Sequence, residues 1–242
     1  MKLVIDIGNT SVTCGLFKNQ TIVKKLNCNS PKLFESFLIK IKKNTIIKII
    51  ISSVVPKYTN DYLLILKKHK QENILIINHK NSHLKLNVLE PSTVGADRLC
   101  NIKATIKLYK HPSIIVDFGT ATTYDVINNK KEFIGGAIAT GIETSAEYLI
   151  KNAALLSKTD LEFPDNAVGI DTKENIQSGI MFGAVDQVEG MINRIQKETN
   201  ENYNIILTGG LASTISPYLK LKHILDSDLT LKGMLYIDES SS

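Results

Sequence analysis

Two stretches of the chain place a carboxylate and a glycine directly after an apolar run. The first is VIDIGNTSVT, residues 4–13, in which Asp6 and Gly8 are followed by three hydroxyl side chains. Glycine lets backbone N–H groups approach a phosphate closely, and the hydroxyls add donors. A carboxylate here repels phosphate, but it can hold a hydrated Mg²⁺ ion that lies between them. One turn of this kind is more often a plain hairpin, so a second observation is needed.

The second stretch, IVDFGTATT at residues 115–123, repeats the pattern nearly half a chain later, with Asp117 and Gly119 in the corresponding places. Two copies predict two similar lobes with a cleft between them, each lobe carrying one phosphate-binding turn. A third stretch, IILTGGLA at residues 205–212, ends a strand with two glycines, which leaves bare backbone for a flat ring or a sugar.

An acid and an arginine lie together between these turns, in VGADR at residues 94–98. Asp97 stands near the start of a predicted helix, where a carboxylate can serve as a cap and interact favourably with the helix dipole. Arg98 can be its surface partner. Taken alone, this short motif favours that structural role.

The hydrophobic pattern predicts the elements that position these motifs. In the first half we expect the order β-β-β-α-β-α-β, over residues 2–8, 11–19, 21–27, 31–43, 46–55, 57–69 and 73–79, followed by a helix from residue 95. In the second half the repeated strands precede helices at 141–156 and 175–199, a strand at 203–210, and a final helix and strand. We therefore expect a first lobe over residues 1–111 and a second over 112–242. An apolar stripe on the 175–199 helix predicts a core or subunit-interface face.

Composition excludes several classes of protein. The 242 residues carry a net charge of +5 without a dense arginine stripe, so a solvated lysine-rich surface is favoured over nucleic-acid binding. The most apolar stretch is interrupted by Lys48 and is too short to span a membrane. The three cysteines show no C-x-x-C spacing, which argues against disulfides and zinc and fits a reducing cytoplasm. No leader peptide is expected before the first strand.

The motifs in their order, DIGNT, GADR, DFGTATT, GGAI, NIQSGI, DQVEG and TGG, resemble those of type III pantothenate kinases. That family is part of the actin, hexokinase and Hsp70 superfamily, and the resemblance runs from residue 4 to about residue 235. It implies an α/β fold with two ribonuclease H-like lobes of βββαβαβ type and an inter-lobe cleft. It also implies ATP-dependent phosphorylation of pantothenate to 4'-phosphopantothenate, the first step of coenzyme A biosynthesis, in a cytoplasmic homodimer.

The same resemblance implies roles for individual residues. It assigns the ATP phosphates, held with Mg²⁺, to Asp6, Ile7, Gly8, Asn9, Thr10, Ser11, Val12 and Thr13. It assigns substrate contacts to Gly95, Ala96, Asp97, Arg98 and Thr172, with Thr172 near a subunit interface. Asp97 would accept the proton of the pantothenate hydroxyl. Asp117 would bind a monovalent cation, K⁺ or NH₄⁺, and Thr120 would touch ATP.

Three positions depart from the family pattern: Val88 stands where a tyrosine is frequent, Thr140 where a proline is, and Asp186 where a glycine is. None of them removes a carboxylate of the expected site. Two other functions stay open at this point. One is a different small-molecule kinase of the same superfamily, such as a sugar kinase, although the chain is short for one. The other is a Baf-type transcription accessory protein, although a non-catalytic relative should have lost the acids kept here.

Overall fold

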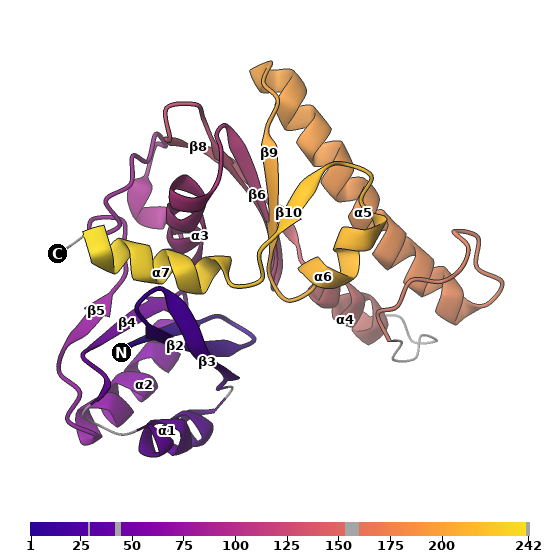
Figure 1. Cartoon of the computed structure of the whole chain (residues 1–242). Coiled ribbons are helices and arrows are strands. Elements are labelled where there is room, and N and C mark those ends of the chain that lie inside the picture. Colours follow the sequence, from indigo (N-terminus) through magenta and orange to yellow (C-terminus); the bar gives the residue numbers. More distant parts are fainter. Residues whose placement is uncertain (29, 42–44, 153–159, 241–242) are drawn as a thin grey trace. The chain divides into compact units, whose positions relative to one another are not determined.

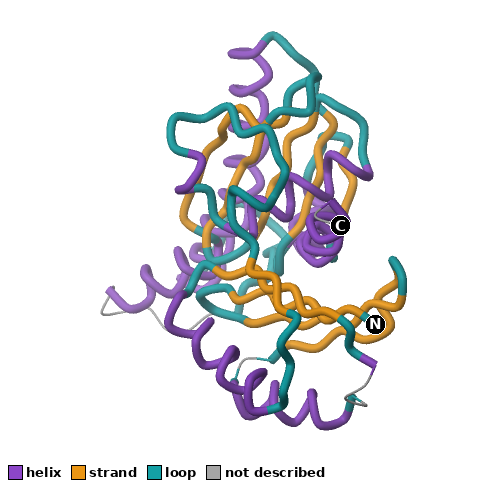
Figure 2. Tube along the Cα trace, turned by 90° about the vertical axis from the view of Figure 1, so that its left-hand side faces the viewer, coloured by secondary structure: helices purple, strands orange, loops and turns teal. Residues whose placement is uncertain are grey.

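The chain folds into two compact units, each built around one mixed sheet. The computed structural model describes residues 1–28, 30–41, 45–152 and 160–240 (Figure 1). The first unit consists of Met1–Tyr109 together with Asp228–Ser242, and the second consists of Lys110–Ser227. In each unit the strands form a layer with helices beside it (Figure 2).

The sheet of the first unit has five strands in the order β3-β2-β1-β4-β5. They span Lys2–Ile7 (β1), Val12–Lys18 (β2), Thr21–Asn27 (β3), Lys48–Ser53 (β4) and Ile74–Ile76 (β5). β1 pairs antiparallel with β2 and parallel with β4, and β2 pairs antiparallel with β3. The strand predictions for residues 2–27 and the strand around 46–55 are confirmed within a few residues at their ends.

Helices pack on both faces of this sheet. α1 (Pro31–Lys40) and α2 (Pro56–Lys68) share one apolar cluster with Ile5 and Ile7 of β1. α3 (Ala96–Leu108) and α7 (Leu229–Ser240) share another with Val4, from the opposite face. α1 begins at Pro31 because Ser30 caps it, accepting a hydrogen bond from the backbone N–H of Leu33. The last three residues predicted for this helix include 42 and 43, which lie outside the described residues.

The second unit repeats the plan with the order β10-β9-β6-β7-β8. The strands span Ser113–Phe118 (β6), Ala121–Ile127 (β7), Phe133–Thr140 (β8), Asn204–Thr208 (β9) and His223–Leu225 (β10). β6 pairs antiparallel with β7 and parallel with β9, as β1 does with β2 and β4. The two copies of the Asp-x-Gly motif therefore stand at equivalent places of two similar sheets, which confirms the predicted repeat.

The second unit has three α-helices, which span Ile142–Asn152 (α4), Thr172–Thr199 (α5) and Ala212–Ile215 (α6) among the described residues. Short 3-10 helices span Pro91–Thr93 (η2) in the first unit and Ser216–Tyr218 (η3) in the second. Residues 153–156, also predicted as helix, lie outside the described residues. α5 begins after Asp171, whose side chain accepts from the Glu174 backbone N–H. The apolar stripe of α5 is core: Met181, Val185, Val188 and Ile192 are all buried in the cluster of their own unit.

The end of the chain corrects the predicted domain division. The boundary after residue 111 is close to the observed one after Tyr109, but the final segment belongs to the first unit and ends in helix α7, not in a strand. Apolar residues of α7 pack in the first unit's cluster. Its buried Asp238 forms ion pairs with Lys2 of β1 (2.7 Å) and Lys48 of β4 (2.5 Å). Burial acts to raise the pKa of Asp238, but the two lysines outweigh it and hold the pKa below its ordinary value.

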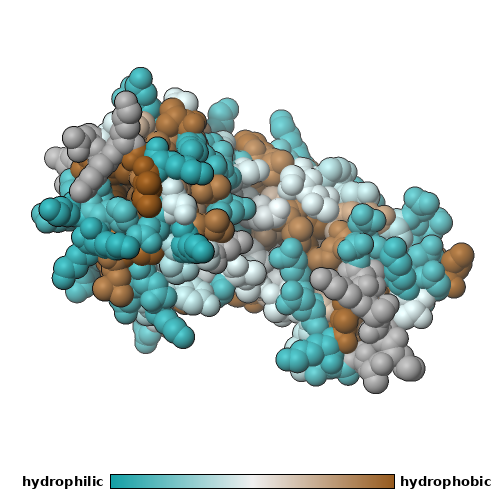
Figure 3. Space-filling model, turned by 90° about the horizontal axis from the view of Figure 1, so that it is seen from below, coloured by the Kyte–Doolittle hydropathy of each residue, from teal (hydrophilic) through white to brown (hydrophobic). Residues whose placement is uncertain are grey.

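No helix in the described ranges is long and apolar enough to span a membrane. The face drawn in Figure 3 shows brown apolar patches among teal hydrophilic side chains. Several large apolar side chains of the second unit are nevertheless well exposed. They are Ile138, Tyr148, Val168 and Ile170.

The contact between α3 and α7 generates a stability prediction. A Cβ atom on Gly233 of α7 would lie 1.9 Å from the carbonyl oxygen of Cys100 in α3. Because this neighbour is backbone, Gly233→Ala must separate the helices, and we expect a loss of about 3 kcal/mol in the free energy of unfolding. Chemical denaturation measures it.

The matched control is Gly190→Ala in α5, where a Cβ would meet nothing within 4 Å. The same substitution there should stabilise the protein by about 1 kcal/mol, because alanine is the better helix former. Equal unfolding midpoints for Gly233→Ala and the unmodified protein would contradict the close packing.

Candidate functional site

The first turn presents its carboxylate on one defined face of the sheet. Asp6 is the second-last residue of β1 and lies in register with Thr13 of β2 and Ser52 of β4. Side chains alternate along a strand, so Ile5 and Ile7 point to the α1–α2 face and Asp6 to the α3–α7 face. The Ser52 hydroxyl donates to Asp6 Oδ1 at 2.8 Å. The carboxylate is thus tethered from the neighbouring strand.

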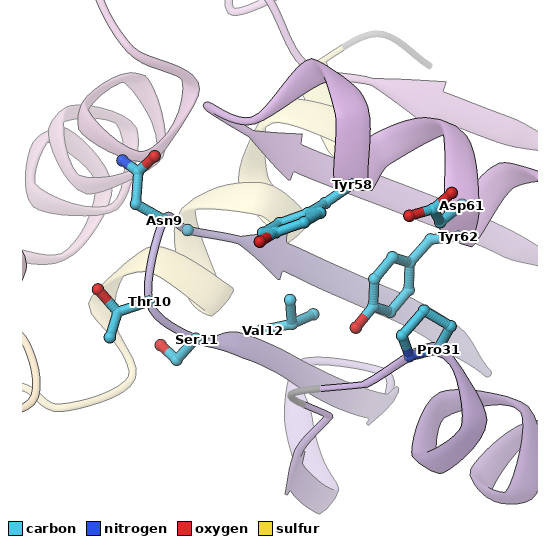
Figure 4. Close-up of a pocket in the computed structure, with 9 residues that line it drawn as sticks. Asn9, Thr10, Ser11, Val12, Pro31, Tyr58, Asp61 and Tyr62 are labelled. Atoms are coloured by element: carbon cyan, nitrogen blue, oxygen red, sulfur yellow. The ribbon is translucent and has the colours of Figure 1, made fainter.

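The loop that follows forms part of a pocket on the opposite face. Gly8 N–H donates to the Ser11 carbonyl at 2.9 Å, which closes the turn. Residues 8–12 line a cavity of about 200 Å³. The cavity is completed by Pro31, Tyr58, Asp61 and Tyr62. Figure 4 shows Tyr58 of α2 reaching toward the loop that carries Asn9 and Thr10, while Tyr62 points toward Val12 and Pro31. Five of the nine predicted ATP-binding residues therefore border this cavity, whereas Asp6, the buried Ile7, Thr13 and Thr120 do not.

Asp97 is positioned by the beginning of α3. Gly95 precedes the helix, and Asp97 lies in its first turn, where its Oδ1 accepts from the Arg98 backbone N–H at 2.7 Å. A Cβ on Gly95 would lie 2.6 Å from that same oxygen, so glycine leaves room for the carboxylate. Burial raises the pKa of Asp97 above its ordinary value, and the N–H and positive charge of Arg98 offset part of the rise.

The negative charges of Asp6 and Asp97 both act on the buried thiol of Cys100. Burial raises the pKa of this thiol well above its ordinary value, and the negative charges of Asp6 and Asp97 raise it further. A hydrogen bond with Ser52 opposes the rise. Cys100 is completely buried one turn after Asp97. In the first unit, two of the three predicted carboxylates, from β1 and α3, therefore lie within electrostatic range of one buried thiol.

Asp117 occupies the equivalent position in the second unit. It lies in register with Thr123 of β7 and Thr208 of β9. Gly209 has a φ of +94°, and a Cβ there would lie 2.4 Å from Asp117 Oδ1. Only glycine combines that backbone conformation with room for the carboxylate. As in the first unit, a hydroxyl residue stands beside the aspartate on each neighbouring strand.

The turn after Asp117 is held by the start of α4. The carbonyl of Thr120 accepts from Gly141 N–H at 3.2 Å and from the Thr144 hydroxyl at 2.9 Å. A Cβ on Gly141 would lie 2.4 Å from the carbonyl oxygens of both Gly119 and Thr120, so the backbones approach as closely as glycine permits. The Thr120 side chain is exposed at this rigid turn.

The surroundings of Asp117 fit a cation with oxygen ligands. The hydroxyl of Thr123 is buried and has no hydrogen-bond partner, although its strand neighbour in register is Asp117. A buried orphan hydroxyl is costly unless something binds it. Within the described residues, no three His, Cys, Asp or Glu side chains are grouped as metal ligands.

Thr172, the remaining predicted substrate contact, is the first residue of α5 and is exposed in the second unit. Sequence reasoning missed the hydroxyl residues beside each aspartate, namely Ser52, Thr123 and Thr208. Two of them could have been found by superposing the two repeats, because ISS and ILT each end the strand parallel to the Asp strand with a hydroxyl at the matching register. It also missed Gly141, whose role depends on a contact with the turn two strands earlier.

Comparison with known proteins places these features in a family. A family model for type III pantothenate kinase matches residues 2–194. A type III pantothenate kinase from Sulfurihydrogenibium sp. (strain YO3AOP1) is 38% identical, covering 99% of this chain and 100% of the relative. The enzyme of that name from Persephonella marina (strain DSM 14350 / EX-H1) is 39% identical, covering 97% of this chain and 96% of its own.

Solved structures agree on the fold. A Campylobacter jejuni protein described as a Baf family transcriptional activator aligns with a TM-score of 0.65 and 21% identity, covering 98% of both chains. The activator of 2-hydroxyisocaproyl-CoA dehydratase from Clostridium difficile, solved with bound ADPNP, gives 0.57 and 12%, covering 99% of this chain and 95% of its own. At these identities the likeness concerns the fold alone. The family match and the full-length relatives carry the assignment, and on that ground the chain belongs to the type III pantothenate kinase family.

Proposed function

We propose that this protein transfers the γ-phosphoryl group of ATP to the primary hydroxyl of pantothenate, which gives 4'-phosphopantothenate at the start of coenzyme A synthesis. The observation that carries the proposal is that the first unit holds Asp6 by the Ser52 hydroxyl and Asp97 at the start of α3, in a chain of this family. Phosphoryl transfer asks for placement and charge stabilisation more than for covalent help from the protein. Two fixed carboxylates of different environment suit a step that needs both a base and a metal ligand.

Asp97 is the residue proposed to act on the substrate. The pantothenate oxygen bonds to the γ-phosphorus, its proton passes to the Asp97 carboxylate, and the bond from phosphorus to ADP breaks. A base placed this way typically contributes about 10²- to 10⁴-fold. Burial raises the pKa of Asp97, which makes its carboxylate a better proton acceptor than that of an exposed aspartate. Gly95, Ala96 and Arg98 would line the substrate side, with the Arg98 guanidinium available for the pantothenate carboxylate.

The nucleotide is assigned to the two Asp-x-Gly turns. Residues 6–13 would hold phosphates through backbone N–H groups and hydroxyls, and Thr120 would contact ATP from its exposed turn. The oxygen groups around Asp6 fit a hydrated Mg²⁺, which supplies positive charge to the triphosphate when bound. We assign the monovalent cation, K⁺ or NH₄⁺, to Asp117, and the orphan hydroxyl of Thr123 supports that assignment.

A homodimer in the cytoplasm is part of the same proposal. Its support is two apolar side chains of the second unit, those of Val168 and Ile170, which are 82% and 91% exposed and lie close to Thr172 in sequence. Exposed apolar side chains can mark an association surface when they gather into a patch. Thr172 would then contact substrate near the subunit interface.

The other functions considered have weaker support. A sugar kinase would share the fold, but the relatives that match across the full chain are named for pantothenate. The Baf-described structure is 21% identical, so its likeness bears on fold and not on activity. The direct test is mass spectrometry of pantothenate after incubation with the protein, ATP, Mg²⁺ and K⁺. We expect phosphopantothenate, and phosphorylation of sugars in its place would overturn the proposal.

Replacing the proposed base gives a kinetic prediction with a pH signature. The ionised form of Asp97 accepts the proton, so kcat/KM should fall as the pH drops through its pKa, which lies above the ordinary value near 4. Asp97→Asn should lower kcat by about 10²- to 10⁴-fold and remove that acidic limb. Circular dichroism should show an unchanged fold. Activity within about threefold of the unmodified enzyme would remove Asp97 from this role.

The cation site gives a second prediction. If Asp117 and Thr123 hold K⁺, replacing K⁺ by Na⁺ should slow the unmodified enzyme, and Asp117→Asn should be slow in both salts. Thr123→Val keeps the shape of the side chain but removes the hydroxyl, so it should need more K⁺ for half-maximal rate. Thr214→Val, at a partly exposed position of α6 in the same unit, is the control. A K⁺ response that is the same in Thr123→Val and the control would contradict the site.

A further inference from the structure

Ser52 stands at the centre of the polar group in the first unit. It is completely buried near the end of β4, in register with Asp6 on the adjacent parallel strand. Its hydroxyl donates to Asp6 Oδ1 at 2.8 Å, and the same hydroxyl is hydrogen-bonded with the Cys100 thiol. A serine in this place therefore connects the phosphate-turn strand β1 with the helix that carries Asp97.

The direction of these hydrogen bonds follows from the protons available. A serine hydroxyl has one proton, and Asp6 Oδ1 receives it. Burial and the charges of Asp6 and Asp97 raise the pKa of the Cys100 thiol well above its ordinary value, so the thiol keeps its proton and adds no negative charge beside Ser52. The hydrogen bond from Ser52 to Asp6 is the one that carries the argument. A partly buried carboxylate that accepts such a bond is restricted in its rotation and loses less entropy when a ligand arrives.

We propose that Ser52 is a positioning residue for phosphoryl transfer: its hydroxyl fixes the Asp6 carboxylate in the orientation that receives Mg²⁺ and the ATP phosphates. The expected effect on the rate of phosphoryl transfer rests on the proposed function. The expected effect on Mg²⁺-dependent ATP binding rests on the geometry of Ser52 and Asp6. Ser52 itself touches neither substrate nor nucleotide. Thr208 holds the equivalent register beside Asp117, which shows that both sheets place a hydroxyl on the strand parallel to the Asp strand.

The test compares two variants of the same shape, Ser52→Thr and Ser52→Val. Threonine keeps the hydroxyl and valine lacks it, so the strain of one larger side chain at a buried position is common to both. A hydrogen bond to a charged group is worth about 10- to 100-fold in an equilibrium or rate. We expect Ser52→Val to lose that factor in kcat/KM for ATP relative to Ser52→Thr, with the KM for pantothenate changing less than about twofold.

A binding measurement separates this proposal from the proposed function. Calorimetry of ATP with and without Mg²⁺ needs no pantothenate. In the unmodified protein and Ser52→Thr, Mg²⁺ should tighten ATP binding, and in Ser52→Val that gain should shrink about 10-fold or more. If pantothenate is not phosphorylated, the proposed function fails, while the binding result still decides the role of Ser52.

Ser113→Ala is the control for loss of a buried serine, because Ser113 is also completely buried and its hydroxyl donates to the Lys110 carbonyl in the second unit. It should leave the Mg²⁺ response unchanged. Ser52→Val and Ser52→Thr with equal Mg²⁺ responses would overturn the proposal. So would a loss in Ser52→Val that Ser113→Ala reproduces.

Discussion

The first unit depends on holding two partly buried carboxylates, those of Asp6 and Asp97, whose charges both act on the buried Cys100 thiol. Moving a carboxylate partly out of water costs free energy, because water solvates its charged form. The structure offsets the cost with one directed donor for each acid: the Ser52 hydroxyl for Asp6 and the Arg98 backbone N–H for Asp97. These donors reach the two acids only if helix α3 packs closely on the sheet. Helix α7 contacts α3 through Gly233, and its Asp238 forms ion pairs with Lys2 and Lys48 of the sheet.

Both units position a carboxylate with the same arrangement of three strands. A strand ends in Asp-x-Gly, an antiparallel partner supplies a threonine in register, and a parallel partner supplies serine or threonine. The two units differ in what the neighbouring hydroxyl binds. In the first, the Ser52 hydroxyl donates to Asp6, which fits a carboxylate that is already oriented to bind Mg²⁺. In the second, the Thr123 hydroxyl is buried without a partner, which fits a site completed by a bound cation.

The parts of this fold that could be predicted from the sequence are those fixed by local pattern. Apolar runs that end in Asp-x-Gly marked β1 and β6, and the helical period marked α1, α2 and most of α5. The place of α7 could not be predicted, because its partners, Cys100 and the lysines of β1 and β4, are far away in the sequence. The role of Ser52 could not be predicted for a related reason. A single serine in an apolar strand is recognised as a partner of Asp6 only when the register of the two strands is known. The convergence of Asp117 with the other two acids stays a prediction.

The central claim is that Asp6 and Asp97 act as one site, and a double-mutant cycle tests it most directly. Rates of γ-phosphoryl transfer to pantothenate would be measured for Asp6→Asn, Asp97→Asn and the double variant, with labelled ATP to reach low activities. Groups that act as a unit are strongly non-additive. The account predicts a double variant about as slow as the slower single variant. Losses that multiply in full would show that the two carboxylates act independently and would contradict it.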